Sequence, residues 1–110
     1  MSVIDISYHL SYYEMVKYID WDTKKNEQLK KTRGISFEEV LDVMFEDGLI
    51  KTERHPNWKK YPTQHIFIVE IRKYAYIVPF VEDAEKYFFK TIIPSRKATK
   101  QYIQTKKGET

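Results

Sequence analysis

A loop expected at residues 54–62 holds the densest group of side chains in this sequence that could do chemistry. It carries an imidazole, two ammonium groups, a phenol and an indole: His55, Lys59, Lys60, Tyr61 and Trp58. An imidazole exchanges protons near neutral pH, ammonium groups neutralise phosphoryl oxygens, and aromatic rings stack on unpaired bases. We therefore expect proton transfer at His55 or Tyr61, and nucleic-acid contacts at Trp58 and Lys60. The alternative is that the aromatic and proline residues only seal the edge of a sheet.

A second basic group, Ser95-Arg96-Lys97, stands at the expected start of the last helix. Basic side chains in a first turn oppose the helix dipole and cost about 0.3–1 kcal/mol each, so local stability would not select them. Free backbone amides beside a guanidinium and an ammonium group make a phosphate pocket, and we expect Lys90 from the last strand next to it. The alternative is a surface pair satisfied by nearby acidic groups.

The sequence offers little for a metal ion or a bound cofactor. Its three histidines, His9, His55 and His65, have no ligand-like spacing and no paired carboxylate beside them, and there is no cysteine. It contains no Gly-rich phosphate loop and no nucleophile elbow. We therefore expect no metal, no cofactor, no nucleotide hydrolysis and no acyl transfer.

Charge is segregated along the chain although the net charge is only +3. Residues 23–37 sum to +4, residues 38–53 to −5, residues 54–81 to +4 and residues 82–110 to +3. Such segregation permits one face that attracts phosphate and another that repels it. The alternative for each block is ordinary solvated surface.

Length and composition indicate one globular domain. The chain has 110 residues, 42% of them apolar and 15% aromatic, which excludes intrinsic disorder. No apolar run approaches the roughly 20 residues that span a bilayer, and no export signal is visible. We expect a cytoplasmic protein, since the lack of cysteine also fits a reducing compartment.

Capping residues delimit two helices in the first half of the chain. After an extended piece at Tyr18–Trp21, Asp22 can cap a helix that runs to about Arg33 and ends before Gly34. Ser36 and Glu39 form a capping box, and a hydrophobic staple can join Ile35 to Val40. The second helix buries apolar residues at helical spacing and ends at Gly48: Phe37, Val40, Leu41, Met44 and Phe45.

Four strands are expected after Gly48, where β-branched and aromatic residues predominate. They are Leu49–Arg54, Gln64–Ile71, Tyr74–Val81 and Tyr87–Ile93. Short breaks between them predict hairpins, and Pro79 predicts a bulge or a strand end. A last helix is expected from about Arg96 to Gln104. The fold class is therefore α+β, with two N-terminal helices packed on a four-stranded, mainly antiparallel sheet and a C-terminal helix.

The two ends of the chain are expected to lie outside this domain, which we place at residues 15–104. Apolar residues alternate with polar ones over residues 4–12, which predicts a strand, although a helix over residues 7–18 fits a second stripe. An exposed apolar strand there could pair with a second copy and give a homodimer. Residues 105–110 are expected to form a flexible tail.

Three motifs together resemble the BrnT family of bacterial toxins. They are Trp21-Asp22-x-x-Lys25-Asn26-x-x-Leu29-Lys30, then Arg33-Gly34-Ile35-Ser36-Phe37-Glu38-Glu39, and finally Ile93-Pro94-Ser95-Arg96-Lys97-Ala98 with Tyr102. The likeness covers about residues 16–103. Residues 1–14 have no counterpart, and Met15 stands where family members usually begin. Where the family often has Lys-His-Gly, this chain has Thr32-Arg33-Gly34, and Arg33 could bind phosphate there.

The resemblance implies a RelE-like fold and a cytosolic ribonuclease of a type II toxin–antitoxin system. Such a protein stops translation by cleaving RNA, on or off the ribosome, and is held inactive by a cognate DNA-binding antitoxin. In the reaction expected here, the 2′-hydroxyl attacks its own phosphate without a metal. His55 or Tyr61 would move the proton, Arg96 and Lys90 would stabilise the phosphorane, and Lys60 with Lys97 would hold the RNA backbone. The alternative is a non-catalytic protein that blocks a topoisomerase or a ribosomal surface with the same basic face.

Overall fold

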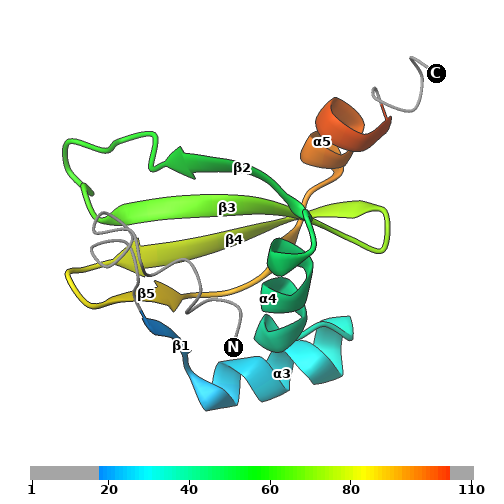
Figure 1. The fold of residues 1–110 in the computed structure, drawn as a ribbon, viewed down its shortest axis with the longest axis horizontal. Coiled ribbons are helices and arrows are strands. Elements are labelled where there is room, and N and C mark those ends of the chain that lie inside the picture. The colour runs from blue at the N-terminus through cyan, green and yellow to red at the C-terminus, as the bar shows by residue number, and fades with distance from the viewer. Residues whose placement is uncertain (1–17, 105–110) are drawn as a thin grey trace, which may run out of the picture.

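The computed structural model describes residues 18–104 and has an α+β architecture, as the sequence predicts (Figure 1). Two helices, α3 (Thr23–Arg33) and α4 (Phe37–Phe45), lie between the first and second strands. The strands are β1 (Tyr18–Trp21), β2 (Leu49–Arg54), β3 (Gln64–Ile71), β4 (Tyr74–Glu82), β5 (Lys86–Phe89) and β6 (Ile93–Pro94). A short helix, α5 (Arg96–Ala98), continues into a π-helical segment, η2 (Thr99–Gln104). The strand or helix expected within residues 4–18 lies almost entirely outside the described residues.

The sheet is mixed and has more strands than the four expected. Its order is β1-β5-β4-β3-β2, and β6 pairs with β4 beyond the end of β5. The chain from β2 to β5 forms the antiparallel meander that the short breaks predict. The extended piece at Tyr18–Trp21 adds a parallel edge strand on β5. This pairing was not predicted, because β1 and β5 lie far apart in the sequence and their contact leaves no local pattern.

Both expected helix caps on the N-terminal helices are present. The Asp22 carboxylate accepts a hydrogen bond from the Lys24 amide (3.0 Å), and Gly34 ends α3 in the left-handed region with φ 64°. The Ser36 hydroxyl accepts a hydrogen bond from the Glu39 amide (3.1 Å) and so begins α4. The Glu39 carboxylate pairs with the guanidinium of Arg72, which ties α4 to the β3–β4 turn.

The expected strand over residues 87–93 is divided in two, and Pro79 explains why. Between the pairs Phe80↔Phe89 and Ile77↔Ile93, β4 contributes residues 78 and 79 whereas the facing chain contributes residues 90–92. This extra residue is a bulge, as Pro79 predicts, because proline has no amide hydrogen for the ladder. The Lys90 amide still donates to the Pro79 carbonyl (2.8 Å), which fixes Lys90 at the bulge.

The two faces of the sheet carry separate apolar clusters. The face under α3 and α4 holds the larger cluster, which includes Phe37, Phe67, Phe80 and Phe89. The opposite face packs Ile68 and Ala75 against the C-terminal helical segment. That segment is fixed by buried Thr99, whose hydroxyl donates to the Ser95 carbonyl and accepts from the Ala75 amide, each at 2.8 Å. Figure 1 shows this C-terminal segment at one end of the sheet.

Candidate functional site

A hollow of about 140 Å³ brings together two of the expected site residues, His55 and Lys90. It lies over Ile66 and Pro79, which face each other across β3 and β4. Its lining is completed by further residues of the same strands and of the loop after β2: Pro56, Gln64, His65, Phe80 and Val81. His55 follows the end of β2 directly, and Lys90 follows the end of β5. The hollow therefore collects an imidazole and an ammonium group from residues 35 positions apart in the sequence.

The local bonding of His55 sets which hydrogen its ring presents. Its Nδ1 accepts a hydrogen bond from the Asn57 amide (2.9 Å), so the neutral ring carries its hydrogen on Nε2. The Tyr61 ring lies 4.7 Å from the His55 ring, centroid to centroid. The loop brings them together because Asn57 begins a turn in which its carbonyl accepts from the Tyr61 amide (3.0 Å). His55 and Tyr61 are thus neighbours, as the sequence predicts for one loop, and His55 presents a donor.

Trp58 and Lys60, the two expected RNA-binding residues of the loop, do not line the hollow. The guanidinium carbon of Arg54 lies 3.9 Å from the Trp58 ring centroid, so one face of that indole is occupied. Lys60 lies with its ammonium nitrogen 5.4 Å from the Tyr61 ring centroid. Both side chains are exposed on the loop between β2 and β3.

A second hollow of about 310 Å³ lies along the same face and shares Ile66 with the first. Lys97 and Tyr102 line it from the C-terminal helical segment, and Lys51 lines it from β2. Hydrogen bonding to Glu53 and the neighbouring Tyr102 raise the pKa of Lys51 above its usual value, and its ammonium nitrogen lies 3.1 Å from the Glu53 carboxylate. The positive charge of this hollow is therefore partly balanced.

Arg96 lines neither hollow, contrary to the expectation that it stabilises the phosphorane together with Lys90 and beside His55 or Tyr61. Figure 1 shows α5 and the β2–β3 loop at opposite ends of the sheet. The Ser95 hydroxyl also accepts from the Ala98 amide (3.0 Å), so the cap itself uses an amide that the expected phosphate pocket needed. The start of α5 and the β2–β3 loop are separated by the length of β2 and β3, and this separation could not be predicted from the sequence.

Arg33 is likewise placed away from both hollows. Its guanidinium donates a hydrogen bond to the Ile92 carbonyl, beside the bulge between β5 and β6. This bond joins the end of α3 to the sheet, so the visible role of Arg33 is to hold the two layers together.

Sequence reasoning missed Phe88, which pairs with Val81 of the first hollow, and Lys86, which lies near the Phe88 ring. Lys86 and Phe88 alternate along β5 with Tyr87 and Phe89, which face the core, so they share the opposite face of the sheet. Lys90 follows the end of β5. The ammonium nitrogens of Lys86 and Lys90 lie 5.7 Å and 5.6 Å from the Phe88 ring centroid. This alternation was readable in the sequence, but only the structure shows which face the helices leave open.

Within residues 18–104, no group of three or more histidine or acidic side chains could hold a metal ion. None of the helices described for this part of the chain is long and apolar enough to cross a membrane.

Comparison of the chain with protein-family models, curated proteins and solved structures gives no match. The resemblance to the BrnT family therefore rests on the three motifs quoted above.

Proposed function

We propose that this chain is a cytoplasmic, RelE-like toxin that inhibits translation by cleaving RNA at the hollow shared by His55 and Lys90. The observation that carries the proposal is the meeting of an imidazole and an ammonium group over the Ile66–Pro79 pair. A phosphodiester seated there would meet a hydrogen-bond donor and a positive charge, which are the groups that stabilise a phosphorane.

In the proposed reaction the 2′-hydroxyl attacks the adjacent phosphorus and the bond from phosphorus to the 5′-oxygen breaks. The proton that the 2′-hydroxyl loses is moved by His55 or Tyr61 to the leaving 5′-oxygen. A 2′,3′-cyclic phosphate and a 5′-hydroxyl result, so no metal-bound water is consumed. Lys90 would neutralise the phosphoryl oxygens, and the His55 Nε2–H group would donate to one of them. For His55 to accept the 2′-hydroxyl proton at Nε2, the ring must exchange tautomers and release the Asn57 amide.

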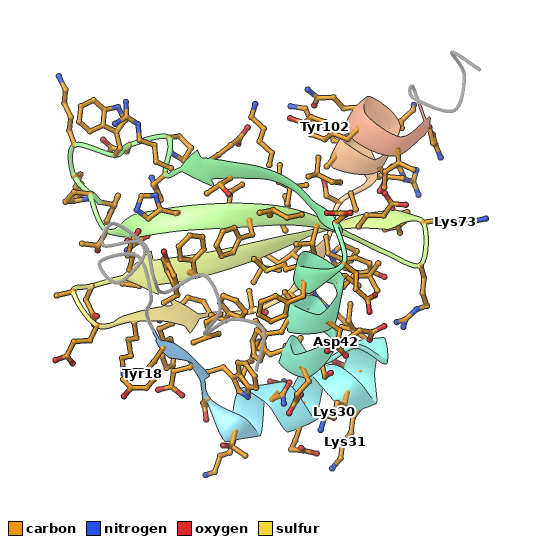
Figure 2. The ribbon with its side chains drawn as sticks, viewed as in Figure 1. Tyr18, Lys30, Lys31, Asp42, Lys73 and Tyr102 are labelled. Atoms are coloured by element: carbon orange, nitrogen blue, oxygen red, sulfur yellow. The ribbon has the colours of Figure 1, made fainter. Side chains whose placement is uncertain are left out.

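The decisive experiment is induced expression followed by mapping of RNA ends in arrested cells. We expect new 5′-hydroxyl ends with the wild-type chain and none with His55→Gln or Lys90→Gln. Lys73→Gln is the matched control, because Lys73 lies in the β3–β4 turn and points away from the molecule (Figure 2). New ends that persist in both hollow variants would contradict cleavage at this place.

The second candidate is a non-catalytic protein that blocks a ribosomal or topoisomerase surface, and the tautomer of His55 favours it. An imidazole that presents only a hydrogen-bond donor binds an anion without moving a proton. Under this reading, induced cells stop growing although no new RNA ends appear.

We also propose a cognate antitoxin as the partner that restrains the toxin. An acidic segment with aromatic or aliphatic anchors would neutralise Lys60 and Lys90 and cover Tyr61. Homodimer formation through residues 1–14 is the competing use of a second chain. A chain that starts at Met15 should lose self-association but keep antitoxin binding, measured by light scattering and by pull-down with the neighbouring gene product.

A further inference from the structure

The part of the sheet formed by β5 carries an aromatic ring between two lysines on the face opposite α3 and α4. Phe88 pairs in register with Val81 of β4 on one side and with Asp20 of β1 on the other. Val81 lines the hollow that contains His55, so Phe88 stands one strand away from that hollow. Lys90 belongs to both places, since it lines the hollow and lies near the Phe88 ring.

This ring is not part of either apolar core. The larger cluster takes Tyr87 and Phe89 from β5, and the smaller one is built from β2, β3, β4 and the C-terminal segment. Among the described residues, neither cluster includes Phe88, which is half-buried. Tyr18, on the neighbouring edge strand, is 78% exposed. Packing on the described core therefore does not explain an aromatic residue at position 88.

We propose that Phe88 is a stacking platform for an unpaired base and that Lys86 and Lys90 hold the flanking phosphates. The inference rests on the proposed action on RNA and names its substrate class, which is single-stranded RNA. Every base offers a π-face to a ring when it is unpaired, whereas in a duplex both faces are already stacked. The strand would run from β5 across Lys90 to the hollow of His55.

Charge favours a nucleic acid over a protein as the occupant. Lys86 and Lys90 flank the ring on both sides along the strand, so an apolar protein anchor would have to bury two ammonium groups to cover it. A base with its phosphates leaves the ring covered and both charges paired. The Lys86 ammonium, 3.4 Å from the Asp20 carboxylate, would exchange this exposed partner for a phosphate.

The test measures the affinity of the full chain for a short single-stranded RNA and for a duplex of the same length by fluorescence anisotropy. We expect Phe88→Leu to weaken single-strand binding about ten-fold and Phe88→Trp to restore it, because alanine scans assign this order of magnitude to one stacked base. Phe45→Leu is the matched control, since Phe45, which was wrongly expected on the buried face of its helix, is 69% exposed on α4, on the other side of the sheet. Lys86→Gln should reduce the slope of log affinity against log salt by about 0.7, the value for one phosphate contact on a single strand.

Three outcomes would overturn the inference: unchanged affinity in Phe88→Leu, an equal loss for the duplex, or a failure of tryptophan to rescue. Loss of self-association in Phe88→Leu with RNA affinity intact would assign the face to protein contact and also overturn it. The proposed cleavage is judged separately by RNA ends. Binding that depends on Phe88 without new RNA ends supports the stacking platform and contradicts the cleavage. New RNA ends that are insensitive to Phe88→Leu support the cleavage and contradict the platform.

Discussion

Two neighbouring phenylalanines, Phe88 and Phe89, show how differently the faces of this sheet are used. Phe89 is fully buried and lies with its ring centroid 5.9 Å from that of Phe37 and 6.3 Å from that of Trp21. Phe88 is half-buried between two lysines on the opposite face. The face under α3 and α4 thus concentrates the aromatic packing, whereas among residues 18–104 the opposite face keeps Phe88 partly exposed beside its two lysines. Stability and the proposed RNA contacts therefore depend on alternate residues of the same strand.

The largest expected effect is the loss of stability in Phe89→Ala. Removing a fully buried phenylalanine leaves a cavity among the rings of Phe37, Phe67 and Phe80, so the free energy of unfolding should fall by about 3–5 kcal/mol. Phe88→Ala should cost much less, because its ring is only half-buried. Chemical denaturation of both variants measures the difference. Equal losses would mean that the two faces contribute alike and would break the comparison.

Lys90→Gln and Arg96→Gln separate the hollow from the start of α5. Lys90 lines the hollow with His55 and Arg96 does not, so RNA cleavage should fall about a hundred-fold in the first variant and much less in the second. Both side chains are exposed, so neither substitution should lower the melting temperature appreciably. Rates of cleavage of a labelled RNA measure the effect. A larger loss in Arg96→Gln would move the reaction to the C-terminal segment.

Asn26→Ala tests how the helices stay on the covered face. Asn26 is 3% exposed; its carbonyl oxygen accepts from the Phe37 amide, and its amide nitrogen donates to the Glu38 carboxylate, each at 2.8 Å. The variant leaves a buried amide at the start of α4 without that acceptor, so the free energy of unfolding should fall by about 1–3 kcal/mol. Glu38→Gln keeps an acceptor for Asn26 and should cost less. Thermal unfolding measures this difference. Equal stability of the two variants would contradict the role of Asn26 in holding the helices on the sheet.

Local signals were sufficient for much of this fold. Asp22, Ser36 and Gly34 mark helix ends where the structure has them, and β2 and β3 have the bounds that the sequence predicts. The β3–β4 hairpin is closed by Arg72 and Lys73, both with positive φ, which no residue type at those positions announces.

The candidate site was less predictable because it depends on long-range placement. His55 and Tyr61 share a loop, and sequence proximity was a sound guide to their contact. Lys90 was expected next to Arg96 as a residue of the last strand, but the chain passes through the bulge and β6 between them. Asn26 was recognised only as part of a motif, because a buried amide with two partners gives no periodic pattern.

The smallest expected effect concerns acid, and it links the covered face to a single carboxylate. Hydrogen bonding from Asn26 and from its own backbone amide holds the pKa of Glu38 below its usual value of 4.5. A group whose pKa is lower in the folded state stabilises the fold above its unfolded pKa, and that contribution disappears as the pH falls through the folded value. The wild-type chain should therefore lose more stability between about pH 5 and about pH 3 than Glu38→Gln does. Denaturant midpoints measured across that interval test this, and identical pH dependence in the two chains would show that the Asn26–Glu38 bond has no electrostatic share in holding α3 to α4.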